Sequence, residues 1–364
     1  MVAAGVAALV SAPLVVRALP AAEQSVSAAT LLGRIQASGG AGYSGYAEAV
    51  GGLRLPLIDQ FSGLADMLGG RTRLRVWWRD ARDWRVDAIS ATGEYDLHRV
   101  PGQLWAWDYE RNEATRYRDP AVRLPRAADL DPAQLGRRLL SEAVPAEVTR
   151  LPARRVAGVD AAGLRLRPID PRTMISRVDL WADITTGLPL RVEVFAAGAG
   201  PSGAADRPVV DTSFLDVSLR LPSPETTRFT PPATARISSW GEFDLAAAAD
   251  LYSAGQPPPG ELAGYPLRRR IAGVGGVGTY GRGVATLAAL PLPERIAWRL
   301  RDRLADTSGV RETAEGQLLT VGPLSLLLTR PRGEPGQAWL LAGTLTADTL
   351  QQAAAELRTA ARRG

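Results

Sequence analysis

The stretch VDLWADITTGLPLRVEVF, from Val178 to Phe195, has the pattern of a β-hairpin. Apolar side chains alternate along both halves of the stretch, as strands with one buried face require. The alternating residues are Val178, Leu180, Ala182, Leu190, Val192 and Val194. Between the halves, residues 183–187 supply turn chemistry, and Gly187 can adopt the positive φ that closes such loops. The stretch therefore predicts two paired strands of a larger sheet.

More strand-like segments precede the hairpin, at a spacing of about ten residues and with polar turns between them. They are residues 43–50, 72–79, 84–89, 94–100, 104–109, 114–118 and 164–167, and a further segment, 210–219, follows the hairpin. Alternation with short connections is typical of an antiparallel meander. The sequence therefore predicts that one antiparallel sheet dominates the first two thirds of the chain.

A few short helices interrupt this series of strands. Ser27 can cap a helix whose apolar face is Ala28, Leu31, Leu32 and Ile35. Asp131-Pro132 opens a second helix, which carries Leu135, Leu139 and Leu140, with proline at a first-turn position that tolerates it. Residues 56–68 are apolar with a looser period, and we expect a third short helix there.

The composition changes after the segment FTPP at 229–232, and the Pro-rich segment 253–261 has the character of a semi-rigid linker. Beyond it we expect a small α+β unit. Its predicted strands are 283–290, 317–321, 324–329 and 338–343, with a helix that begins at Pro293 and a closing helix capped by Thr346. The sequence thus predicts a large domain over 27–235, a linker over 236–262 and a small domain over 263–364.

The composition excludes several kinds of chemistry. The chain has 364 residues and no cysteine, so it has no disulfides, no thiolate metal site and no cysteine nucleophile. It has no lysine either, so all 43 basic residues are arginine, and neither a Walker A loop nor a Schiff base is possible. No cofactor and no metal site are expected from the sequence.

A sequence pI near 9.9 raises the question of a polyanion partner. Arginines alternate with apolar residues in the strand segment that contains Arg71, Arg73 and Arg75, and acidic residues are nearly as numerous as basic ones. This pattern favours a solvated sheet face over a polyanion-binding face, and no nucleic-acid partner is expected.

The N-terminal segment has the character of an export signal. Residues 2–16 form an uncharged, mostly apolar run, followed by Arg17 and the small-residue stretch ALPAA. That length fits a signal-peptide core and is short for a membrane-spanning helix. We expect residues 1–22 to be a signal peptide or a membrane anchor, and the protein to be extracytoplasmic and close to a membrane surface.

Three further motifs suggest chemistry that their surroundings do not support. The segment GVGTYG at 276–281 matches the dinucleotide fingerprint, but a β-like run follows it where a helix is needed, and we expect an interdomain connection there. His98 is the only histidine and lacks a serine-hydrolase context, so we expect a surface side chain. The aspartate pairs 80/83 and 129/131 are better explained by turns and helix caps. No enzyme activity is expected.

What remains is apolar surface on the strands. If the sheet curves over a cavity for an acyl chain, alternation places a set of apolar side chains on its lining. The predicted ligand-binding residues are Leu74, Val76, Trp78, Trp84, Val86, Leu180 and Val192. The other interpretation is that these residues fill an ordinary aromatic-rich core.

The order of several motifs resembles the actinobacterial branch of the LolA/RseB-like family. These motifs are the helix followed by SGY (44–46), RVWW (75–78), DWRVD (83–87), GEYDLHR (93–99), LWAWDYERNEATR (104–116), the opening hairpin, and FTPP. The segment AWLLAGTLTADTLQQAAAELR (338–358) is similar in order to the small C-terminal domain of RseB-like members.

This resemblance implies an α+β fold in which a half-open antiparallel β-barrel wraps around helices, with a small α+β domain after it. It also implies that the concave face binds a lipid or a lipoprotein acyl chain. In RseB-like members such binding accompanies control of a membrane anti-sigma factor and its sigma factor. Two alternatives stay open: a lipid or lipoprotein carrier without a regulatory role, and an envelope scaffold with a filled core.

Overall fold

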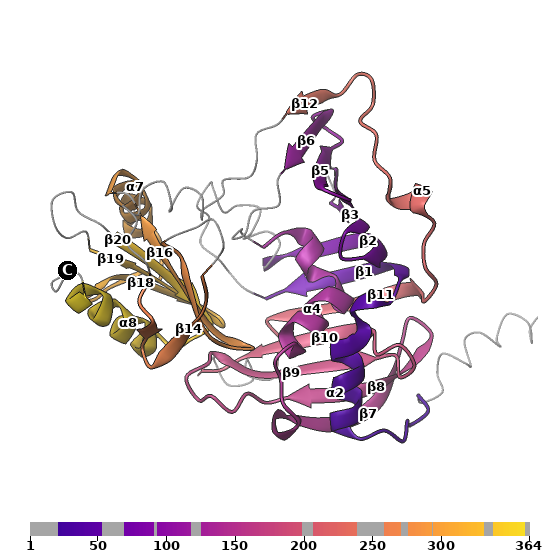
Figure 1. Cartoon of the computed structure of the whole chain (residues 1–364), viewed down its shortest axis with the longest axis horizontal. Coiled ribbons are helices and arrows are strands. Elements are labelled where there is room, and N and C mark those ends of the chain that lie inside the picture. Colours follow the sequence, from indigo (N-terminus) through magenta and orange to yellow (C-terminus); the bar gives the residue numbers. More distant parts are fainter. Residues whose placement is uncertain are drawn as a thin grey trace, which may run out of the picture.

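The computed structural model describes residues 21–52, 69–90, 93–117, 125–198, 207–238, 258–270, 276–292, 294–330 and 338–360. The helix expected over 56–68, most of the linker over 253–261 and nearly all of the N-terminal segment lie outside these residues. Within them, the chain is an α+β protein made mostly of strands, arranged in two sheets (Figure 1).

The larger sheet has twelve strands in the order β12-β6-β5-β4-β3-β2-β1-β11-β10-β9-β8-β7. Their bounds are β1 (Tyr43–Gly51), β2 (Arg71–Asp80), β3 (Asp83–Ile89), β4 (Glu94–Val100), β5 (Gln103–Asp108), β6 (Glu113–Tyr117), β7 (Val148–Val156), β8 (Val159–Leu166), β9 (Ile175–Ala182), β10 (Pro189–Ala196), β11 (Val210–Ser218) and β12 (Arg236–Ser238). Neighbours are antiparallel except β12, which runs parallel to β6. The edge strands β12 and β7 do not pair with each other, so the sheet is open.

The opening stretch forms the predicted hairpin of β9 and β10, in which Leu180 faces Val192. Gly187 has a φ of 71°, as the turn required. The Asp183 side chain accepts hydrogen bonds from the backbone N–H and the hydroxyl of Thr186, which holds the turn closed. The hairpin prediction is confirmed.

Two helices pack on one face of this sheet, which we call the inner face (Figure 1). They are α2 (Ala28–Ala37), which packs on β7 and β8, and α4 (Pro132–Leu140), which packs on β10. Ser27 and Asp131 cap them as predicted, since each side chain accepts a backbone N–H of the first turn. The short helices η1 (Ser38–Gly40), η3 (Ala127–Leu130) and η4 (Pro145–Glu147) complete the connections.

The opposite, outer face is crossed by residues 219–235, which run from the end of β11 to β12 and which we call the outer strap. The strap contains the short helix α5 (Pro224–Thr227), which packs on β2, β3 and β4. Asp83 accepts a hydrogen bond from the Thr227 hydroxyl at 2.5 Å, and Arg79 donates to the carbonyl of Pro222. Polar contacts therefore hold the strap on the sheet, one at the end of β2 and one at the start of β3.

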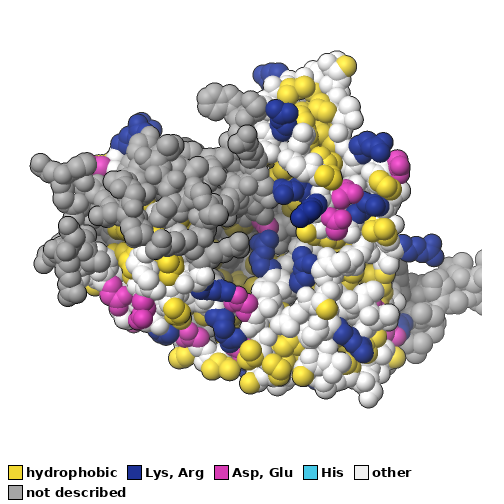
Figure 2. Space-filling model, viewed as in Figure 1, with side chains coloured by type: hydrophobic (Ala, Val, Ile, Leu, Met, Phe, Trp, Pro, Cys, Tyr) yellow, Lys and Arg dark blue, Asp and Glu magenta, His cyan; other side chains and the backbone are white. Residues whose placement is uncertain are grey.

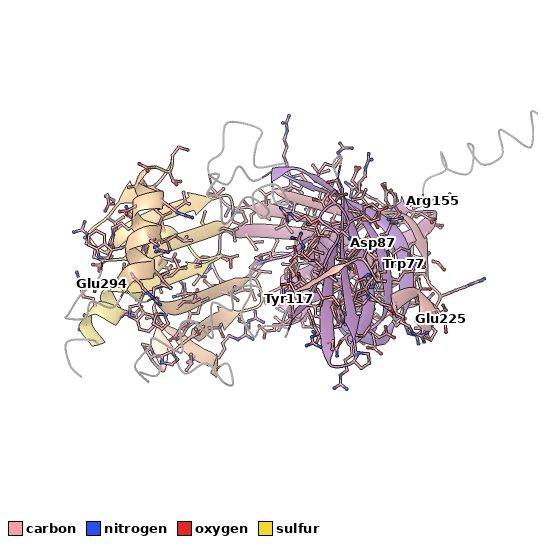
Figure 3. The ribbon with its side chains drawn as sticks, turned by 90° about the horizontal axis from the view of Figure 1, so that it is seen from above. Trp77, Asp87, Tyr117, Arg155, Glu225 and Glu294 are labelled. Carbon is pink, nitrogen blue, oxygen red and sulfur yellow. The ribbon has the colours of Figure 1, made fainter. Side chains whose placement is uncertain are left out.

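The second sheet has eight strands in the order β13-β14-β15-β16-β20-β19-β18-β17, all antiparallel. Its strands are β13 (Glu261–Leu262), β14 (Tyr265–Arg270), β15 (Gly278–Arg282), β16 (Ala285–Leu292), β17 (Arg311–Glu312), β18 (Gly316–Val321), β19 (Leu324–Thr329) and β20 (Ala338–Gly343). The helices α7 (Glu294–Ala305) and α8 (Ala347–Ala360) pack on it. Figure 3 shows the two sheets side by side, with Asp87 on the larger sheet and Glu294, the first residue of α7, beside the smaller one.

Some expectations need correction. The segment GVGTYG does not connect domains: it leads directly into β15, which turns at residues 283–284 and pairs with β16. A strand followed by a hairpin does not present a helix N-terminus, which the dinucleotide fingerprint requires. The strand β7 was not predicted, because Pro152 and several arginines obscure the alternation in this edge strand.

Candidate functional site

The predicted ligand-binding residues on β2 and β3 meet in one apolar cluster on the inner face. Leu74 and Val76 are fully buried, and Val86 and Trp78 nearly so. Trp84 is partly buried against the same cluster, and its ring stacks on that of Trp78 with centroids 5.7 Å apart. The remaining core partners include Tyr43, Phe214, Leu130 and Ala133.

Leu180 and Val192 lie in a second inner-face cluster. Both are fully buried, among side chains of α2 that include Leu31 and Ile35. Helix α4 links the two clusters, because Ala133 at its start belongs to the first and Leu140 at its end belongs to the second. Helices and side chains thus cover the inner face, and an acyl chain would need one of these layers to move.

A buried polar group sits between the sheet and the start of α4. Tyr43 donates a hydrogen bond to Asp131, and Gln134 donates one to the Tyr43 hydroxyl at 3.0 Å. Burial raises the pKa of Asp131 to about 7, although the hydrogen bonds from Tyr43 and from the Ala133 N–H act in the opposite direction. Asp131 therefore caps α4 and is also a carboxyl group, buried in the apolar core, that titrates near neutral pH.

Turns of the second sheet contact both inner-face clusters. Val284, in the β15–β16 turn, is part of the cluster that contains Leu180 and Val192. Val321 and Leu324, at the β18–β19 turn, pack against the cluster that contains Leu74 and Val76. The second sheet therefore covers part of the apolar surface that α2 and α4 leave uncovered on the first sheet.

Polar contacts surround these apolar ones. Arg282 pairs with the buried carboxylate of Glu147 at 2.6 Å, and the Gly283 N–H donates to Glu142 at 2.6 Å. Arg268 also pairs with Glu142. Burial alone would raise the pKa of Asp170, but hydrogen bonds from Tyr265 and Arg172 outweigh it and lower that pKa. The carboxylates of Glu142, Glu147 and Asp170 thus hold the second sheet against the first.

A cavity of about 170 Å³ opens at this junction. Its lining comes from both sheets and includes Leu139, Glu147, Leu166, Tyr265, Arg282 and Val284. These residues were not predicted from the sequence, because the contacts join positions far apart, such as Arg282 and Glu147, which are 135 residues apart. No local pattern along the chain signals such a pair.

The outer face carries charged side chains arranged in pairs. Arg165 makes two 2.6 Å hydrogen bonds to Asp179, and Arg154 pairs with Glu193 at 3.0 Å. On the side that Figure 2 shows, where α2 and α4 lie in Figure 1, arginine and acidic side chains are also interspersed. This arrangement supports the solvated and ion-paired sheet face over a polyanion-binding face.

His98 is not a surface residue, contrary to expectation. Its side chain is 2% exposed because the outer strap covers it, and the ring of Phe229 stacks on it with centroids 4.5 Å apart. Phe229 lies 131 positions further along the chain, so strand alternation alone could not reveal the cover. The aspartates behaved as expected: Asp129 and Asp131 cap helices, and Asp80 closes a turn by accepting the Arg82 N–H.

No family model and no curated protein matches the chain. Among solved structures, it is similar to MucB of Pseudomonas aeruginosa in the MucA/MucB complex, with 18% identity, a TM-score of 0.49, and coverage of 90% of this chain and 96% of that one. A structure of MucB with MucA(peri) gives 17% identity, a TM-score of 0.48, and coverage of 90% and 97%.

A LolA superfamily protein from Nitrosomonas europaea shares 13% identity, with a TM-score of 0.24, and the match covers 56% of this chain and 99% of that one. The structural neighbours are thus MucB and LolA-superfamily proteins at low identity. Likenesses at these scores do not decide the function of this chain. Among the described residues, no helix is long and apolar enough to span a bilayer.

Proposed function

We propose that this chain is a non-enzymatic, extracytoplasmic regulator of the RseB-like type, in the actinobacterial branch that its motifs resemble. In this proposal it binds an acyl chain of a lipid or lipoprotein and modulates a membrane anti-sigma factor. The observation that carries the proposal is the apolar inner face of an open sheet, on which turns of a second sheet pack. In this proposal the twelve-stranded sheet, with α2 and α4 on its inner face, serves as the half-open barrel of a LolA-like fold.

The proposed ligand site is the inner face that contains Leu74, Val76 and Val192. Each buried methylene of an acyl chain contributes about 0.8 kcal/mol, so eight contribute roughly 6 kcal/mol before association costs. Because these side chains are buried, the acyl chain of the ligand must enter where a covering layer can move away from the sheet. The junction with the second sheet is the proposed entrance, since it already contains a cavity lined by residues of both halves.

A disulfide staple across this junction tests the proposal. A Cβ built on Gly283 would lie 3.9 Å from the Glu142 Cβ, a separation that suits a disulfide. The natural chain has no cysteine, so the double variant Glu142→Cys/Gly283→Cys has a single possible bridge. We expect the oxidised protein to lose most binding of a fluorescent acyl probe and to regain it on reduction.

The controls are the two single-cysteine variants, which carry the same substitutions one at a time and cannot form the bridge. They should bind the probe alike under oxidising and reducing conditions. If the parent protein binds no acyl probe, the scaffold interpretation replaces the ligand proposal. If the stapled protein binds as well as its reduced form, the entrance lies elsewhere on the inner face.

The partner proposal rests on the motif resemblance, and MucB itself has been solved in complex with MucA. Its test is capture of the purified chain by the extracytoplasmic part of an anti-sigma factor from the same genome, with and without acyl ligand. Binding that the ligand weakens supports a regulator. Transfer of the probe between vesicles without any protein partner would instead favour the carrier.

A further inference from the structure

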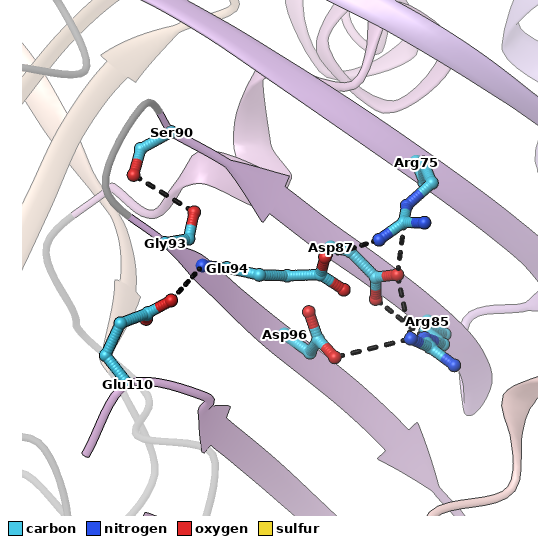
Figure 4. A network of polar contacts seen from close by, with 8 residues as sticks. All are labelled: Arg75, Arg85, Asp87, Ser90, Gly93, Glu94, Asp96 and Glu110. Atoms are coloured by element: carbon cyan, nitrogen blue, oxygen red, sulfur yellow. Dashed lines mark hydrogen bonds and ion pairs between the residues drawn. The ribbon is translucent and has the colours of Figure 1, made fainter. Parts of the chain in front are cut away.

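Two aspartates face each other on the outer face of the larger sheet, in a position that normally destabilises a sheet. Asp87 on β3 and Asp96 on β4 are direct cross-strand partners, and both side chains are buried, at 0% and 4% exposed. Like charges placed opposite each other repel. His98 lies two positions beyond Asp96 on the same face of β4, also buried (Figure 4 shows the acidic part of the cluster).

Two arginines compensate the carboxylates only in part. Arg85 binds both oxygens of Asp87, at 2.6 and 2.8 Å, and reaches Asp96 Oδ2 at 3.3 Å. Arg75 pairs with Glu94 at 2.5 Å and lies 3.5 Å from Asp87. Two arginines therefore face the three carboxyl groups of Asp87, Glu94 and Asp96.

Asp96 has the weakest arginine contact of the three carboxylates, a single one at 3.3 Å. Its Oδ1 is buried and accepts no hydrogen bond from the described residues. Buried polar atoms without a partner are rare in native proteins, and a bound ion is one way in which such an atom is satisfied.

We propose that Asp87, Asp96 and His98 form a binding site for one divalent transition-metal ion of the Zn²⁺ class beneath the outer strap. One ligand atom from each of the three side chains lies within 4.8 Å of the others. Atoms bound to one Zn²⁺ at about 2.1 Å lie roughly 3–4 Å apart, so small side-chain rotations complete the site. Carboxylate oxygens with an imidazole nitrogen suit Zn²⁺ and its neighbours.

The surroundings resemble the outer shell of a metal site. A carboxylate offers about four lone-pair positions, so Asp87 can accept from Arg85 and still bind an ion. Nδ1 of His98 lies 3.4 Å from the carbonyl oxygen of Thr227, and a metal-bound imidazole commonly donates its second N–H to such a carbonyl. Because Thr227 belongs to α5, an ion at this site would fasten the strap to the sheet.

The composition of the chain makes the test specific. His98 is the only histidine and there is no cysteine, so any metal spectrum with a nitrogen ligand from an imidazole reports on this site alone. We expect the metal-free full chain to bind Co²⁺ and Zn²⁺ with one-to-one stoichiometry, by visible absorption and by calorimetry. Zn²⁺ should also raise the melting temperature, since it binds only the folded arrangement.

Asp96→Asn is the decisive variant, because it keeps the size of the side chain and removes a proposed carboxylate ligand. It should fold with at least the parent's stability and weaken Zn²⁺ binding at least about tenfold. His98→Gln should do the same and abolish the nitrogen signature, while Asp108→Asn, on β5 outside the cluster, should bind as the parent does.

Two results would overturn the proposal, which does not depend on the proposed function. One is the absence of saturable Co²⁺ or Zn²⁺ binding by the parent chain. The cluster would then hold a proton in place of an ion. The other is binding that Asp96→Asn and His98→Gln leave unchanged, which would place the ion elsewhere on the chain.

Discussion

Gly187 shows how one residue fixes the hairpin on which the larger sheet depends. Its φ of 71° is costly for other residues, and a Cβ added there would also meet the backbone carbonyl of Arg34 in α2. The glycine thus allows both the turn and the close approach of the helix.

We expect Gly187→Ala to lower the free energy of unfolding by more than about 2 kcal/mol, measured by urea denaturation. Gly158→Ala is the matched control, since Gly158 has a φ of 82° but no neighbour within 4 Å of an added Cβ. That variant should cost only the backbone term, about 1 kcal/mol. Equal losses in the two variants would mean that α2 does not press on the turn.

Asp131 is a residue whose burial should make stability depend on pH. Its pKa is about 7 in the folded protein, well above the ordinary value of 3.8. The folded state therefore holds the proton more tightly than the unfolded state, and the stability this contributes is present below pH 4 and is lost as the pH rises through 7.

The expected result is a decline in unfolding free energy between pH 4.5 and 7.5 that is at least about 1.4 kcal/mol larger in the parent than in Asp131→Asn. Asparagine can keep the helix cap, which separates the titration from the loss of the cap. The exposed aspartate Asp306, changed to asparagine, should leave the parent's pH profile intact. A profile that Asp131→Asn does not alter would contradict the raised pKa.

At the scale of elements, the packing of α4 on β10 connects the two inner-face clusters. Gly136 faces the hairpin, and a Cβ there would lie 2.7 Å from Pro189 Cβ and 3.0 Å from Val192 Cγ2. Gly33 in α2 is exposed, with no neighbour within 4 Å. These two helical glycines differ in their surroundings and not in their backbone preference.

Alanine at either position should raise helix propensity by about 1 kcal/mol. We therefore expect Gly33→Ala to stabilise the protein by up to about that amount. Gly136→Ala should destabilise it by about 1–3 kcal/mol, because the added methyl group overpacks the α4–β10 contact. Thermal denaturation of the two variants side by side makes the comparison. Stabilisation by both would show that α4 can move away from β10 without loss.

At the scale of the whole molecule, we propose that the two sheets are separately folding domains joined through residues 239–257, which lie outside the described residues. Limited proteolysis should cut in that segment first and leave two fragments that contain the intact sheets. First cuts within β2 to β5 would contradict this division of the chain.

The nicked fragments should stay associated at low salt through the junction around Arg282 and Glu147. Removal of Arg282 leaves the buried carboxylate of Glu147 without its cation, so Arg282→Ala should weaken the association at least about tenfold. Size-exclusion chromatography of the nicked protein measures this. Arg311→Ala, an exposed change on the distal edge strand β17, is the control.

Much of the local structure of this protein follows from the sequence alone. Alternation predicted β2 to β6 and the β9–β10 hairpin, and capping residues predicted α2 and α4, because strand period, turn glycines and helix caps act between residues close in the chain. The same alternation placed Leu74, Val76 and Val86 on one face, where they lie.

What covers each face is set only when the chain folds. Strand alternation gives a side but not its cover, so His98 was expected on the surface and is buried under Phe229 of the outer strap. The partial compensation of Asp87 and Asp96 and the pairing of Arg282 with Glu147 likewise depend on strands brought together by folding. Burial and charge pairing depend on which residues are neighbours in space, and residues far apart in the sequence become neighbours only when the chain folds.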